Sequence, residues 1–162
     1  MDQDTFEIIQ KVHYLFKEKG LTLAAAESCT GGLVSHYLTA LPGASEFFEA
    51  GLVTYSNEAK MKLLGVSPET ISGHGVISEQ VAKEMAEKAR ALAGTDYGFS
   101  TTGNLGPSTL EGKERGLVYL AVSGKGRTLS RELRFAGDRK ENKEKAALSA
   151  LKLLIEAVSS AS

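Results

Sequence analysis

The feature that most constrains the fold is a short apolar run that gives way to a tight, polar turn. Leu21 to Ala26 is apolar and is followed at once by polar residues, which predicts a buried strand. Glu27-Ser28-Cys29-Thr30-Gly31-Gly32 comes next, and a second apolar stretch then extends from Leu33 to Leu41 before Pro42. Thr30 is the expected N-cap of this second segment, a helix. A strand that turns directly into a helix favours a layered α/β fold.

The remaining elements follow from apolar periodicity and from glycine and proline positions. Strands are expected at 47–55, 97–101, 117–122 and 128–135, with a tight turn at 123–126. Helices are expected at 4–19, 57–64, 78–93 and 139–158, with a short helical turn at 67–69 and loops at 72–75 and 103–116. Strands and helices alternate early and a hairpin comes late. This order predicts a single α/β domain, residues 1–162, with a mixed sheet.

Composition narrows the class of protein. The formal net charge is −1 and the basic residues are scattered, so we expect no nucleic-acid partner. The single cysteine, Cys29, excludes an internal disulfide and indicates a reducing compartment. No signal peptide is visible, and no apolar run approaches the ~18 residues that span a bilayer. We therefore expect a cytoplasmic protein that does not enter a membrane.

Polar residues gather at three predicted strand ends, at 27–32, 55–60 and 101–107. Sites in α/β folds usually lie at the carboxyl ends of strands. The hydroxyl of Ser28 falls in the first turn, beside helix N-terminal amides that can stabilise an oxyanion or bind a phosphate. The same residues also fit a structural role in which Ser28 and Thr30 cap the helix and the glycines pack. Spacing alone does not separate these interpretations.

A serine nucleophile needs a base. His13 and His36 fall in predicted helices, and His74 lies in a glycine-flanked loop where a local hydrogen bond is the commoner role. Lysine is the alternative base in serine–lysine sites. Lys60 lies just after a strand end, where we expect the positive end of a helix dipole to lower its pKa. Most lysines at such places are solvated, and the same argument applies to Lys62.

Other ligand classes are disfavoured. No histidine pair has metal-ligand spacing, and one cysteine cannot complete a zinc site, so no structural metal is predicted. The segment Gly124 to Thr128 lacks the glycine spacing of a phosphate-binding loop, and no G-x-G-x-x-G opens a helix after the first strand. Arg139 follows the expected N-cap Asp138. It would pair with a phosphate or carboxylate, or simply face solvent.

Several segments together resemble the CinA C-terminal domain family. The sequence Ala26-Glu27-Ser28-Cys29-Thr30-Gly31-Gly32 is similar to its hallmark, and Tyr55-Ser56-Asn57-Glu58-Ala59-Lys60 follows in family order. Leu41-Pro42-Gly43-Ala44-Ser45, Leu63 to Val66, His74 to Ser78, Thr102-Gly103, Gly106-Pro107 and Gly137-Asp138-Arg139 also occur in that order. The resemblance extends from about residue 5 to 158.

The resemblance implies a three-layer α/β/α fold and hydrolysis of the carboxamide of nicotinamide mononucleotide, with no metal or organic cofactor. By motif position Ser28 would be the nucleophile, Lys60 its base and Tyr55 a catalytic neighbour. Substrate contacts are expected from Thr30, Gly31, Gly32, Thr102, Gly103 and Arg139. Amides near Thr30 and Gly31 would hold the oxyanion. A homodimer or larger homo-oligomer is also implied.

One loop departs from the family pattern. Where family amidases usually carry T-G-I-A-G-P and a glycine-rich stretch, this chain has Asn104 and Leu105 and a more charged continuation to residue 115. If this loop lines the pocket, the substrate would differ. Two alternatives therefore stand beside the mononucleotide amidase: a serine amidohydrolase for another small amide, and a non-enzymatic binding module of the same fold.

Overall fold

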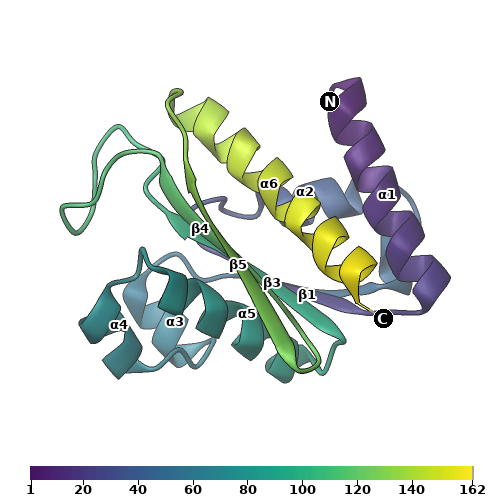
Figure 1. Ribbon diagram of the computed structural model, residues 1–162, viewed down its shortest axis with the longest axis horizontal. Helices are drawn as coiled ribbons and strands as arrows, with labels where there is room; N and C mark the ends of the chain where they lie inside the picture. Colours follow the sequence, from purple (N-terminus) through teal and green to yellow (C-terminus); the bar gives the residue numbers. More distant parts are fainter. Residues whose placement is uncertain (162) are drawn as a thin grey trace.

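The computed structural model describes residues 1–161, which form one mixed β-sheet covered by helices on both faces (Figure 1). The strands are β1 (Leu23–Glu27), β2 (Phe48–Val53), β3 (Tyr97–Gly103), β4 (Leu117–Gly124) and β5 (Arg127–Arg134). The helices are α1 (Gln3–Lys19), α2 (Leu33–Thr39), α3 (Asn57–Lys62), α4 (Pro68–His74), α5 (Glu79–Ala93) and α6 (Arg139–Ser160), with a 3-10 turn at Ala44–Glu46. The predicted α/β fold with a mixed sheet is confirmed.

The order of the strands is β2-β1-β3-β4-β5. Strand β1 pairs in parallel with β2 and β3, whereas β3, β4 and β5 pair antiparallel. Because β2, β1 and β3 run the same way, their carboxyl ends meet at one edge of the sheet. The three polar strand ends predicted from the sequence are thereby neighbours in space.

The two faces of β1 explain how the sheet is covered. Leu23 and Ala25 pack into a core with α1, α2 and α6, whereas Ala24 and Ala26 pack against α5 on the other face. All four side chains are fully buried. A Cβ at Gly98 of β3 would lie 2.4 Å from a main-chain oxygen of α5, so only glycine permits this close approach. Figure 1 shows α1, α2 and α6 on one side of the sheet and α3, α4 and α5 on the other.

Most helix ends agree with the sequence prediction. Gly20 and Gly94 close α1 and α5 in the left-handed conformation. Ser78 caps α5 and Asp138 caps α6 through hydrogen bonds from main-chain N–H groups. Helix α6 begins at Arg139 as expected.

Two local predictions were wrong. Ser72 to His74 belong to α4 rather than to a loop, because the helix continues until Gly75, whose N–H donates to the carbonyl of Ile71 (2.8 Å). Thr30 does not cap α2, since the N-cap position is Gly32 and it contributes no side-chain hydrogen bond.

The carboxylate of Glu27 caps α2 instead. It accepts hydrogen bonds from the N–H groups of Gly32 (3.2 Å), Val34 (3.0 Å) and Ser35 (2.9 Å). It also accepts from the hydroxyls of Thr30 (2.6 Å) and Ser35 (2.7 Å). Glu27 is fully buried, so these five donors replace the water that its charge would otherwise hold. The last residue of β1 thus fixes the turn that contains Ser28.

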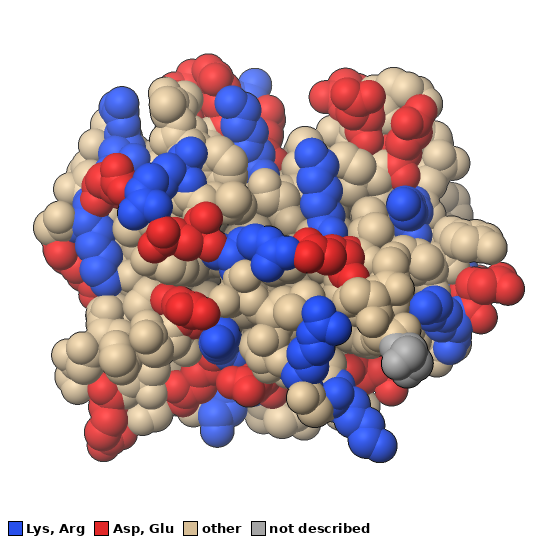
Figure 2. All heavy atoms as spheres, viewed as in Figure 1, with Lys and Arg blue, Asp and Glu red and all other residues tan. Residues whose placement is uncertain are grey.

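The surface is mixed in charge. Lysine and arginine are interspersed with aspartate and glutamate over the face shown in Figure 2. Among the helices of residues 1–161, none is long and apolar enough to cross a membrane.

Replacing Glu27 should destabilise the fold. In Glu27→Ala several buried donors lose their acceptor, and we expect the free energy of unfolding to fall by ~3 kcal/mol or more. Urea denaturation measures the change. Glu49→Ala, at an exposed carboxylate of β2, should stay within ~0.5 kcal/mol of the wild type. Equal effects of the two substitutions would contradict the capping role of Glu27.

Candidate active site

Ser28 and Lys60 meet at the sheet edge defined by β2, β1 and β3. Ser28 follows β1 directly, and its N–H donates to the carbonyl (3.0 Å) and the hydroxyl (3.2 Å) of Thr101 in β3. Lys60 comes from α3, which follows β2. Its Nζ lies 2.9 Å from Ser28 Oγ and 3.3 Å from the carbonyl oxygen of Tyr55. A hydroxyl and an amine at this distance can exchange a proton.

Lys60 is buried, with only 1% of its surface exposed. Burial lowers its pKa from 10.5 to about 8, because the charged ammonium is costly to hold away from water. The sequence analysis thus predicted the right direction for the pKa shift of Lys60 but not its cause. The expected cause was the helix dipole, whereas the main cause is desolvation of Lys60, the fourth residue of a six-residue helix. Lys62 of the same helix is exposed and pairs with Glu58 (2.6 Å).

Cys29 is adjacent to Ser28 but is unsuited to attack. Its side chain is buried, and burial raises the pKa of the thiol to about 12. The thiolate is the nucleophilic form of cysteine, and it is scarce at neutral pH with such a pKa. This supports Ser28 over Cys29 as the candidate nucleophile.

Tyr55 and Arg139 lie at the rim of the site. The Tyr55 ring is largely exposed, and its hydroxyl accepts a hydrogen bond from Arg139 Nη2 (2.9 Å). Arg139 Nη1 donates to the carbonyl of Gly106 (2.6 Å). Arg139 therefore joins the segment after β2 to the loop after β3, with its guanidinium beside the Tyr55 hydroxyl.

A cavity of about 70 Å³ opens at Ser28 and Lys60. Its other lining residues are Cys29, Tyr55, Asn57, Val76, Ile77, Thr102, Gly103 and Leu110. The Thr102 hydroxyl, which is buried, donates to the carbonyl of Val76 (2.8 Å) and is thus already engaged. Five of the site residues expected from the sequence therefore line one cavity, namely Ser28, Tyr55, Lys60, Thr102 and Gly103.

The other expected contacts lie outside this cavity. Thr30 is fully buried, and its hydroxyl bonds to Glu27 and to Thr101 (2.8 Å). The N–H of Gly31 donates to the carbonyl of Ser28 (3.0 Å), and that of Gly32 donates to Glu27. Substrate contacts at Thr30, Gly31 and Gly32 stay predictions.

Two main-chain amides of the turn are available for an oxyanion. Within residues 1–161, the N–H groups of Cys29 and Thr30 donate to no other residue. Cys29 lines the cavity, whereas Thr30 does not. The residue after a serine nucleophile commonly supplies an oxyanion-hole amide. The Cys29 amide is therefore a better candidate than that of Gly31.

Sequence reasoning missed several contributors. Glu27 carried a signal, since an acidic residue that ends an apolar strand must find buried partners. Leu110 carried another, as an apolar residue in an otherwise polar loop. Asn57, Val76 and Ile77 were inside noted segments but had no assigned role.

His74 lines a different cavity, of about 670 Å³, and not that of Ser28. In the described residues, no three His, Cys, Asp or Glu side chains are grouped to hold a metal ion.

Comparisons with known proteins identify the family of the chain. The family model described as the CinA C-terminal domain matches residues 5–158. A CinA-like protein of Acidobacterium capsulatum is 47% identical over 146 residues, which is 90% of this chain and 35% of that protein. A CinA-like protein of a Geobacter species is 47% identical over 139 residues, or 85% of this chain and 33% of that protein. The chain spans about a third of the length of the curated relatives it matches.

Solved structures match over almost their whole length. A competence damage-inducible protein of Klebsiella pneumoniae superposes with a TM-score of 0.94 at 35% identity, covering 98% of this chain and 99% of that one. A CinA superfamily protein of Escherichia coli gives a TM-score of 0.89 at 35% identity, covering 97% and 94%. The three-layer α/β/α fold is shared with these proteins.

The buried ammonium of Lys60 should lower the free energy of unfolding near neutral pH. A pKa lowered from 10.5 to about 8 at ~1.4 kcal/mol per unit predicts that Lys60→Met raises the free energy of unfolding near neutral pH by roughly 2 to 4 kcal/mol. Between pH 8 and 10.5 the folded wild type has released this proton and the unfolded chain has not. Wild-type stability therefore rises with pH in that window, and the advantage of Lys60→Met should disappear by its upper end.

Urea denaturation across this pH range measures the effect. Lys62→Met is the matched control, because Lys62 is exposed in the same helix and should show no such pH-dependent gain. A loss of stability in Lys60→Met at every pH would contradict a desolvated lysine.

Proposed function

The chain belongs to the CinA C-terminal domain family, and we propose that it hydrolyses the carboxamide of nicotinamide mononucleotide. The products are nicotinate mononucleotide and ammonia. The observation that carries the serine–lysine mechanism is the 2.9 Å contact between Lys60 Nζ and Ser28 Oγ in a buried cavity. The identity of the nucleotide rests on the family resemblance of the motifs that contain Ser28, Tyr55 and Lys60.

In the first half of the reaction, neutral Lys60 accepts the proton of the Ser28 hydroxyl while Ser28 Oγ bonds to the amide carbon. The carbonyl oxygen becomes an oxyanion, and the Cys29 amide is positioned to stabilise it. Such a donor typically contributes ~3 kcal/mol to the transition state. Protonated Lys60 then gives its proton to the leaving nitrogen, the carbon–nitrogen bond breaks, and ammonia departs from an ester on Ser28.

In the second half, water replaces ammonia. Lys60 is neutral again and takes a proton from water, which attacks the ester carbon. The bond to Ser28 Oγ breaks, Lys60 returns the proton to that oxygen, and the product leaves as a carboxylic acid that ionises to the carboxylate by releasing its proton to water. A pKa of about 8 suits both roles, because the amine can lose and regain a proton near physiological pH.

A second candidate, hydrolysis of a different small amide, is favoured by the size of the cavity. Ligand sites usually measure ~300–1,000 Å³, whereas the cavity at Ser28 measures about 70 Å³. It accommodates an amide group but not a whole nucleotide. Turnover of the mononucleotide therefore requires that most of the ligand lie outside this cavity or that a wall move.

The central test is ammonia release from nicotinamide mononucleotide. We expect activity in the wild type and a loss of at least ~10³-fold in Ser28→Ala and in Lys60→Ala, since each removes a partner of the same proton transfer. Lys62→Ala is the matched control and should retain activity. Wild-type activity should rise with pH and level off above about pH 8, where Lys60 is neutral.

The outcomes separate the candidate functions. No ammonia from the mononucleotide, but release from nicotinamide riboside, glutamine or pyrazinamide, would favour the second candidate. Full activity in Ser28→Ala would exclude Ser28 as the nucleophile. Inactivity of the wild type toward every amide would support a binding module instead.

Arg139 is proposed to contact the substrate phosphate. Replacing its guanidinium with an amide in Arg139→Gln should raise KM for the mononucleotide by at least about tenfold and up to about 150-fold, because a charge-assisted contact of ~1.5–3 kcal/mol is lost. The effect on nicotinamide riboside, which has no phosphate, should be much smaller. Steady-state kinetics with both substrates measures this difference, and Lys140→Gln at the exposed neighbouring position is the control. An equal change for both substrates would contradict a phosphate contact.

A further inference from the structure

Part of the wall of the Ser28 cavity comes from a side chain of the loop between β3 and β4. Leu110 lines this cavity, yet 59% of its surface is exposed, so it lies between the cavity and solvent. The cavity measures about 70 Å³, well below the ~300–1,000 Å³ of ordinary ligand sites. The position of Leu110 therefore limits what can reach Ser28.

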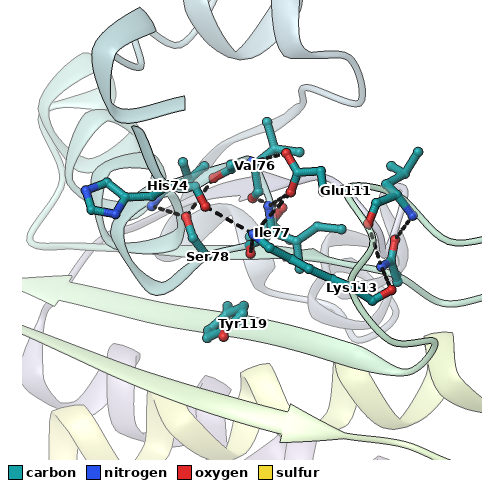
Figure 3. A network of polar contacts seen from close by, with 12 residues as sticks. His74, Val76, Ile77, Ser78, Glu111, Lys113 and Tyr119 are labelled. Carbon is teal, nitrogen blue, oxygen red and sulfur yellow. Dashed lines mark hydrogen bonds and ion pairs between the residues drawn. The ribbon is translucent and has the colours of Figure 1, made fainter. Parts of the chain in front are cut away.

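Glu111 and Lys113 connect this part of the loop to the segment before α5 through hydrogen bonds (Figure 3). The Glu111 carboxylate accepts hydrogen bonds from the N–H groups of Val76 (2.9 Å) and Ile77 (3.2 Å). Lys113 Nζ donates to the carbonyls of His74 (3.0 Å) and Ile77 and pairs with Glu111 (3.2 Å). Val76 and Ile77 themselves line the cavity, so Leu110 is connected to another part of its wall through the neighbouring residue Glu111.

The backbone at Glu111 supports a specific role for its side chain. Glu111 has a φ of 59°, and within residues 1–161 it is the only non-glycine residue with a positive φ. A side chain in this conformation costs ~1 kcal/mol or more, and glycine would avoid the cost. The two hydrogen bonds to Val76 and Ile77 offset it.

We propose that Leu110 is the specificity-determining residue of the Ser28 site and that Glu111 is the positioning residue that holds Leu110 over it. The site then accepts narrow, planar primary carboxamides and excludes amides that carry bulk next to the reacting carbon. This inference rests on the proposed function for the nature of the substrate, but the closure of the cavity is independent of catalysis.

The test measures access to position 28 without relying on catalysis. In a Ser28→Cys host, benzyl and diphenylmethyl methanethiosulfonate are compared, because the first is narrow and planar and the second carries bulk next to the reacting sulfur. The introduced thiolate attacks the reagent's sulfenyl sulfur, a mixed disulfide forms, and methanesulfinate leaves. Tandem mass spectrometry of the peptide that contains both cysteines localises the label by its fragment ions and gives the rate at position 28 separately from that at Cys29. In the host we expect strong preference for the benzyl reagent.

Adding Leu110→Ala should lower the benzyl-to-diphenylmethyl rate ratio at least about tenfold, since pocket fit at this scale changes rates by ~10–200-fold. Adding Glu111→Gly, which suits the positive φ of this position, should lower the ratio in the same direction. Glu111→Gln, which keeps one acceptor oxygen, should restore part of it. Glu114→Gln is the matched control, because Glu114 is in the same loop but pairs with Arg134. Its ratio should stay at the host value.

An unchanged ratio in both Leu110→Ala and Glu111→Gly would overturn the proposal. So would an equal change in both rates, which indicates a general loss of structure rather than a wider opening. A wild type that releases no ammonia from any amide would contradict the proposed function, while the reagent ratios would still decide whether Leu110 closes the cavity.

Discussion

The geometry of the candidate site depends on the buried carboxylate of Glu27. A charge without water is costly unless donors surround it, and here the donors are main-chain and hydroxyl groups of residues 30 to 35. Satisfying that carboxylate forces the chain into one tight turn between β1 and α2. Ser28 lies inside this turn and is tied to Thr101 of the neighbouring strand. The main chain of Ser28, the candidate nucleophile, is thus positioned by the electrostatic requirement of the residue before it, and its side chain is left to contact Lys60 (2.9 Å).

Lys60, at the same sheet edge, is a buried charged group that lacks the compensating partners of Glu27. Its burial matches that of Glu27, but among residues 1–161 it forms no ion pair with a carboxylate. Because burial is not balanced by an ion pair, it lowers the pKa of Lys60 and leaves the amine able to act as a base. A nearby carboxylate would stabilise the ammonium and remove that ability. The fold therefore separates a fully compensated buried charge, which shapes the turn, from an uncompensated one, which suits proton transfer at some cost in stability.

The sequence predicted the parts of this structure that follow from local rules. Apolar periodicity and caps such as Gly20, Ser78 and Asp138 placed the elements to within a few residues, and strand ends indicated the site. It failed where a distant or unpatterned contact decides the outcome. Thr30 has the right residue type for a cap, but the Glu27 carboxylate takes the helix amides first. Gly73 suggested a loop, although α4 continues through it until Gly75. The 2.9 Å contact between Ser28 and Lys60 needs the pairing of β2 with β1, which no local pattern contains.

The loop between β3 and β4 departs from the family pattern at Asn104, and the hydrogen bonds of this residue give the departure a physical explanation. The Asn104 side chain accepts from the N–H of Leu110 (3.0 Å) and donates to the carbonyl of Lys113 (3.1 Å). A small apolar residue at this position offers neither bond, so Asn104 supplies internally what a glycine-rich loop leaves open. Together with the contacts of Glu111, these bonds hold the loop in place, with Leu110 lining the same cavity as Ser28. Ser28 and Lys60 are held at the sheet edge, whereas Leu110 belongs to this loop. In the proposed function, reaction chemistry and substrate size would therefore be set by separate parts of the chain.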